Sequence, residues 1–147
     1  MNPFHRILVA TDLTPHSKPA LDEALELARG NGTELLIAYA YTPPNAAQAQ
    51  SVGGGVYEEW DENLRTDVQS RLQALADGAR RAGVTATPLI LTGVPYEAIS
   101  EAAKDKEADL VVMGTHTKKS VARFFLGSVV SRVISSAPCP VLAVPSA

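Results

Sequence analysis

Short, continuous apolar runs alternate along this sequence with longer segments in which apolar residues recur every three or four positions. A continuous apolar run is typical of a parallel strand covered on both faces, and the recurring pattern is typical of an amphipathic helix. The predicted strands lie at residues 7–12, 34–41, 85–93, 109–114 and 137–145. The predicted helices lie at residues 17–29, 57–83, 95–108 and 128–136. Strict alternation of the two kinds predicts an α/β fold with a doubly wound, five-stranded parallel sheet.

Three prolines decide where two of these strands belong in the sheet. Right-handed crossovers already restrict the order of the strands to a few choices. Pro88 lies within the third run, and Pro138 and Pro140 flank the fifth. Since proline cannot donate to the ladder, both strands are expected at the edges of the sheet. We therefore predict the order 3-2-1-4-5.

The length and composition favour a single domain over residues 1–147, because 46% hydrophobic content in a chain of this size suffices for one sizeable core. No apolar run is long enough to cross a bilayer, and the first residues lack a signal-peptide pattern. We therefore expect a cytoplasmic protein with no membrane partner. Cys139 is the only cysteine, which excludes an internal disulfide and a multi-cysteine metal site. We expect it to be a small packed residue.

The charge is distributed unevenly along the chain. A formal net charge of −3 argues against general nucleic-acid binding. Every acidic residue precedes residue 110, and the charged side chains beyond it are Lys118, Lys119, Arg123 and Arg132. The last quarter of the chain is therefore positively charged. These side chains either belong to a solvated loop or create a local positive field suited to an anion, and the sequence leaves both interpretations open.

Residues 42–56 are predicted to form one long loop. They combine two prolines, a polar Ala/Gln tract and three glycines. Loops of this length in compact domains are functional lids or disordered segments, and the composition does not choose between them.

The predicted topology places a ligand site between the first and fourth strands. In a doubly wound sheet, ligands bind beyond the carboxyl ends of the strands, at the point where the winding reverses. The first strand delivers Ala10, Thr11 and Asp12 to this point, and the fourth delivers Met113 and Gly114. The Asp12 carboxylate would accept hydrogen bonds from ribose hydroxyls. Alternatively, Asp12 only caps the following helix or satisfies nearby loop amides, and Gly114 is only a turn that ends a strand.

Gly127 and Ser128 stand immediately before the last predicted helix. The N–H groups at a helix start and a serine hydroxyl suit a phosphate group, and glycine lets the backbone come close to it. Alternatively, Ser128 is only a helix N-cap. The joint placement of Asp12, Gly114 and Gly127 around one crevice favours a nucleotide site.

The stretch "GTHTKKSVARFFLGS", together with "ILVATD" near the start and "APCPVLAVP" near the end, resembles the universal stress protein family. The signature of that family is Gly, two residues, Gly, nine residues, Gly-Ser/Thr, and the resemblance covers the whole chain. It implies a Rossmann-like fold that binds ATP or AMP, with or without Mg. It further implies that Asp12 contacts the ribose, that the chain near Ala40 holds the adenine, and that the glycine loop with Ser128 takes the phosphates. The candidate nucleotide-binding residues are Ala10, Thr11, Asp12, Ala40, Met113, Gly114, Thr117, Gly127, Ser128 and Val129.

Thr117 stands where the second glycine of this signature is expected. Threonine is poor where φ is positive or where the backbone must touch a ligand, and a left-handed conformation costs it about 1–2 kcal/mol. A cost of that size weakens binding by roughly tenfold. The side chain would otherwise occupy the phosphate space or donate its hydroxyl to a phosphate, and the sequence leaves these alternatives open.

We therefore expect an adenine-nucleotide-binding stress-response protein that acts as a cytoplasmic regulator or sensor. The apolar last strand, exposed at an edge, predicts a homodimer, which the family resemblance also implies. One alternative is a stress protein that does not bind ATP and acts by dimerisation and protein interaction. The other is a slow ATP hydrolase, for which His116 is the only nearby candidate general base. We assign no catalytic residue, no metal ligand and no nucleic-acid partner.

Overall fold

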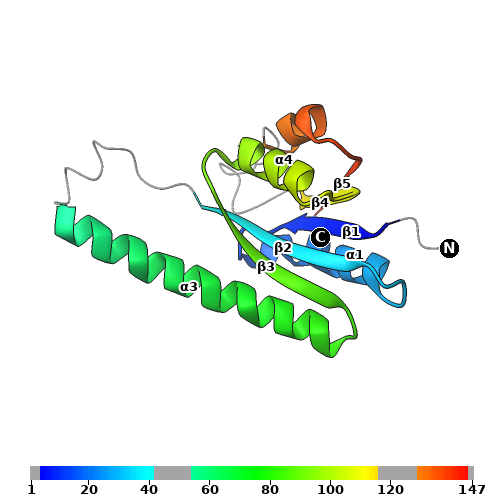
Figure 1. The fold of residues 1–147 in the computed structure, drawn as a ribbon, viewed down its shortest axis with the longest axis horizontal. Coiled ribbons are helices and arrows are strands. Elements are labelled where there is room, and N and C mark those ends of the chain that lie inside the picture. The colour runs from blue at the N-terminus through cyan, green and yellow to red at the C-terminus, as the bar shows by residue number, and fades with distance from the viewer. Residues whose placement is uncertain (1–3, 42–53, 116–128, 146–147) are drawn as a thin grey trace.

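The computed structural model describes residues 4–41, 54–115 and 129–145. Within these residues, the sheet has five parallel strands in the order β3-β2-β1-β4-β5 (Figure 1). The strands are β1 Arg6–Ala10, β2 Glu34–Tyr41, β3 Thr85–Thr92, β4 Leu110–Gly114 and β5 Val141–Val144. The predicted fold class and strand order are confirmed, and both proline-marked strands lie at edges. Pro88 pairs with Ile37 there, since the nitrogen of a proline on an edge strand can face away from the sheet.

The helices alternate with the strands as predicted. They are the 3₁₀ turn η1 Pro15–Ser17, α1 Lys18–Ala28, α3 Gly54–Arg81, α4 Pro95–Asp105 and a further helical stretch at residues 129–136. The first turns of α3 extend beyond the carboxyl ends of the strands (Figure 1).

Several element boundaries differ from the prediction: β5 begins at Val141 and not at residue 137, and α4 ends at Asp105 and not at residue 108. Two further differences lie near the candidate site. β1 ends at Ala10 and not at Asp12, because the side chains of the next two residues bond within the following turn. α3 begins at Gly54, so the prediction that the loop continues to residue 56 is wrong. Glycine is tolerated in a first helical turn, where the N–H groups need no intrahelical partner. Residues 42–53 of the predicted loop lie outside the described residues.

Helices cover both faces of the sheet. α1 and α3 lie on one face, where Val9 of β1 packs in the same core cluster as Leu72 of α3. α4 and the helix at 129–136 lie on the other, where Leu8 of β1 packs with Ile99 (Figure 1). Successive side chains of a strand point to opposite faces, which explains why β1 is apolar at consecutive positions.

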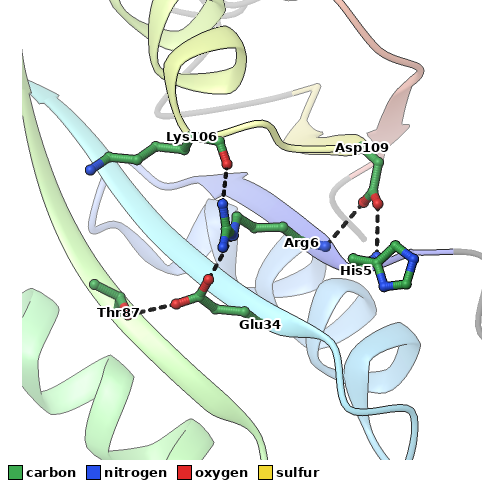
Figure 2. A network of polar contacts seen from close by, with 6 residues as sticks. All are labelled: His5, Arg6, Glu34, Thr87, Lys106 and Asp109. Atoms are coloured by element: carbon green, nitrogen blue, oxygen red, sulfur yellow. Dashed lines mark hydrogen bonds and ion pairs between the residues drawn. The ribbon is translucent and has the colours of Figure 1, made fainter.

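A network of polar contacts lies at the amino ends of the strands (Figure 2). The Asp109 carboxylate accepts hydrogen bonds from the backbone N–H groups of His5 (2.8 Å) and Arg6 (3.1 Å). The Arg6 guanidinium donates to Glu34 Oε1 over 2.7 Å and to the carbonyl oxygen of Lys106. These contacts tie β1, β2 and the connection from α4 to β4 together, at the edge opposite the predicted ligand site.

Candidate functional site

The chain that follows β1 at the carboxyl edge is held by its own polar side chains. Thr11 is buried, and its N–H donates to the Ala38 carbonyl of β2 over 2.9 Å. Its Oγ1 accepts the N–H of Leu13 over 3.0 Å and lies 2.8 Å from the Ser17 hydroxyl. The turn from β1 into η1 is therefore fixed from within and anchored on the neighbouring strand.

Asp12 divides its two carboxylate oxygens between two roles. Oδ1 accepts the N–H of Thr14 over 2.9 Å and the Thr14 hydroxyl over 2.6 Å. Oδ2 is buried and has no hydrogen-bond partner in the described part of the chain. The interpretation of Asp12 as a group that satisfies nearby loop amides is thus correct for Oδ1 alone. A buried acceptor without a donor costs free energy of about 1–3 kcal/mol, so each such atom in a native fold calls for an explanation.

Leu13 adopts a left-handed backbone conformation, with φ at 62°. For a residue with a side chain this conformation costs about 1–2 kcal/mol, and it persists only where the surroundings fix it. The Leu13 side chain packs against the core cluster shared by α1 and α3. Its carbonyl oxygen accepts a hydrogen bond from the Arg71 guanidinium of α3. Strain of this kind, beside a buried carboxylate oxygen with no partner in the described residues, is typical of a functional site.

Four further candidate residues, Ala10, Ala40, Met113 and Gly114, lie at the carboxyl ends of β1, β2 and β4. β1 and β4 are neighbours, so Ala10 and Asp12 share the carboxyl edge with Met113 and Gly114, which are buried at the end of β4. Ala40 is half-buried near the end of β2, on the other side of β1. Val129, another candidate, opens the described part of the last helix.

Thr117, Gly127, Ser128 and His116 lie outside the described residues. Their contacts with Asp12 therefore stay predictions, as does the effect of threonine in place of the signature glycine.

Sequence reasoning missed the contact between α3 and the site. Arg71 lies beside the buried stripe of α3, between Val68 and Leu72, and reads as an ordinary polar residue of an amphipathic helix. The contact between Thr14 and Asp12 had a weak signal in the sequence. In an Asx turn, the aspartate accepts a hydrogen bond from the N–H two residues later. The approach of α3 to the Leu13 carbonyl depends on tertiary packing and leaves no local pattern.

No group of three or more His, Cys, Asp or Glu side chains in residues 4–41, 54–115 and 129–145 could hold a metal ion. No helix in the same residues is long and apolar enough to cross a membrane.

Cys139 lies at the amino edge, away from the candidate site. It is partly buried and packs against the core cluster of the α4 face, as expected of a packed residue. Burial, and to a lesser extent the negative charge of Asp109, raise the pKa of its thiol.

Comparisons with known proteins agree with this fold. The sequence profile of the Universal stress protein family matches residues 3–145. A universal stress protein of Thermus aquaticus is 37% identical over 142 residues, which cover 96% of this chain and 98% of that protein. One of Methanocaldococcus jannaschii is 35% identical over 145 residues, which cover 97% and 83%. The crystal structure of a universal stress protein in complex with cAMP superimposes with a TM-score of 0.73 at 28% identity, covering 98% of this chain and 99% of that one. The chain therefore belongs to the universal stress protein family.

Proposed function

We propose that this protein binds an adenine nucleotide beyond the carboxyl ends of β1 and β4, as one domain over residues 1–147. The observation that carries the proposal is Asp12 Oδ2, a buried carboxylate oxygen with no partner in the described part of the chain. A ribose offers two neighbouring hydroxyl donors, and such a donor would satisfy this atom. The nucleotide cAMP in a related protein supports the class of ligand.

The described residues suggest a division of roles. Asp12 accepts from the ribose, while Thr14 holds the other oxygen of the carboxylate. Ala10 and Ala40 are small residues beside the turn, where a flat base meets little steric hindrance. Gly114, buried at the end of β4, leads into the segment that carries Thr117, Gly127 and Ser128, which we assign to the phosphates. ATP and AMP share the adenosine that this arrangement would recognise, so we propose either as the ligand, with Mg as a companion of the phosphates of ATP.

We further propose that the protein is a cytoplasmic regulator or sensor that works as a homodimer. β5 has a described neighbour on one side only, β4, and its backbone groups on the other side can pair with a second copy. Along β5, Ala143 is exposed and the three other residues are partly exposed. The alternative of a slow ATP hydrolase rests on His116, outside the described residues, and stays a prediction.

Calorimetric titration with AMP and ATP tests the binding proposal, with GMP as a comparison. We expect the wild-type protein to bind both adenine nucleotides at millimolar concentration or below. Asp12→Ala should weaken binding at least tenfold, because a ribose donor then loses a charged acceptor. Asp22→Ala is the matched control, since Asp22 is an exposed aspartate of α1 paired with Lys18. Folded protein that binds neither AMP nor ATP would refute the proposal.

A further inference from the structure

One peptide unit of the β1–η1 turn connects α3 to Asp12. This unit joins Leu13 to Thr14: its carbonyl accepts a hydrogen bond from the Arg71 guanidinium, and its N–H donates to Asp12 Oδ1 over 2.9 Å. The peptide unit is planar, so a donor that fixes the direction of the C=O also fixes the direction of the N–H. Arg71 therefore acts on the Asp12 carboxylate through one rigid group.

The turn needs a stabilising contact from outside at this point, because the backbone of Leu13 has an unfavourable conformation. Its φ of 62° is rare for a residue with a branched side chain, and a relaxed Leu13 would rotate this peptide unit. Rotation would remove the Thr14 N–H from Asp12 Oδ1 and leave the carboxylate held by the Thr14 hydroxyl alone. Oδ2 would then be held less firmly in the buried position in which it has no partner in the described chain.

Arg71 is well placed to provide this stabilising contact. It lies next to Leu72, which is fully buried, and one turn after Asp67, whose carboxylate is 3.9 Å from its guanidinium. The buried side of α3 fixes the backbone of Arg71, and Asp67 lies close enough to attract its side chain. The positive charge strengthens the hydrogen bond to the Leu13 carbonyl.

We propose that Arg71 is a positioning residue for the nucleotide site: it holds the Leu13–Thr14 peptide so that Asp12 presents Oδ2 to the ribose. The inference about affinity rests on the proposed function, whereas the inference about the turn does not. Arg71 thereby makes the packing of α3 a determinant of affinity, although Arg71 itself does not touch the ligand.

Four variants separate this role from a general effect of charge. Arg71→Met keeps most of the aliphatic stem and removes the donors, and Arg71→Lys keeps the charge and one donor group. Arg65→Met is the matched control, because Arg65 is an exposed arginine of the same helix. Leu13→Asn supplies a residue that adopts positive φ more readily, so the turn depends less on Arg71.

The first measurement needs no ligand. Amide hydrogen exchange of Thr14, followed by NMR in the free protein, should be about three- to tenfold faster in Arg71→Met, as expected for loss of a partly exposed, charge-assisted hydrogen bond. It should be unchanged in Arg65→Met and closer to wild type in Arg71→Lys. Unchanged Thr14 exchange in Arg71→Met would overturn the proposal whether or not the protein binds a nucleotide.

The second measurement is calorimetric titration with AMP. Arg71→Met should weaken AMP binding about three- to tenfold in the wild-type background and less than about twofold in the Leu13→Asn background. Arg65→Met should bind as the wild type does. An equal loss in both backgrounds would overturn the proposal, because Arg71 would then act without the turn. A wild-type protein that binds no AMP or ATP refutes the proposed function instead, and the exchange experiment still decides the role of Arg71.

Discussion

Replacing Asp109 by alanine should destabilise the protein by about 2 kcal/mol. Its carboxylate accepts the N–H of His5 in an exposed position and that of Arg6 in a partly buried one. A hydrogen bond to a charged acceptor contributes about 1.5–3 kcal/mol when shielded, and an exposed one contributes less. We therefore assign about 0.5 kcal/mol to the His5 bond and about 1.5 kcal/mol to the Arg6 bond. The Arg6 guanidinium keeps its bonds to Glu34 and Lys106, so the rest of the network should persist.

Urea unfolding followed by circular dichroism, at one fixed protein concentration, measures this loss. With a slope of about 2 kcal/mol per molar urea for a chain of this size, the midpoint should fall by about 1 M. Asp105→Ala is the control, because Asp105 is exposed at the end of α4 and should change stability by less than about 0.5 kcal/mol. A midpoint for Asp109→Ala within about 0.2 M of the Asp105→Ala midpoint would refute this reasoning.

The remaining predictions concern Cys139 and the oligomeric state. Burial and the Asp109 charge raise the pKa of the Cys139 thiol. In Asp109→Asn, the midpoint of the pH profile of alkylation by iodoacetamide should therefore shift to lower pH. An unchanged midpoint would contradict the effect assigned to the charge. The Cys139 thiol has a higher pKa in the folded protein than in the unfolded chain. Its contribution to stability is therefore fully present below the unfolded pKa of about 8.5, and it is lost as the pH rises through the folded pKa. Sedimentation at micromolar concentration should show a dimer, and a monomer would exclude pairing through β5.

The arrangement of the sheet could be predicted because its signals are local and strong. Buried strands of a parallel sheet read as continuous apolar runs, and Pro88 and Pro140 confine their strands to edges. Once the order was known, the carboxyl ends of β1 and β4 had to meet, which placed Asp12 near Gly114. This much follows from strand order and needs no knowledge of side-chain geometry.

The details of the candidate site could not be predicted, because they depend on tertiary packing and leave no local signal in the sequence. Nothing in the sequence marks Leu13 as left-handed, since leucine has no preference for positive φ. The hydrogen bond from Arg71 spans 58 positions of sequence and exists only because α3 packs beside the turn. The start of α3 at Gly54 was missed because three glycines favour a loop by composition, and the helix overrides that local preference.

The network at the amino edge was missed for a similar reason. Asp109 and Arg6 look like ordinary charged residues that flank apolar runs. Only the parallel pairing of β1 with β4 brings the carboxylate of Asp109 to the backbone N–H of Arg6.

The central claim is that Asp12 Oδ2 recognises the hydroxyl groups of a ribose. Its most direct test is a calorimetric comparison of AMP with 2′,3′-dideoxyadenosine monophosphate, in the wild type and in Asp12→Ala. We predict that the wild type binds AMP at least about tenfold more tightly, because a hydrogen bond to a charged acceptor is made only with AMP. In Asp12→Ala this preference should fall below about twofold. An equal preference for AMP in both proteins, or no preference in the wild type, would contradict the claim.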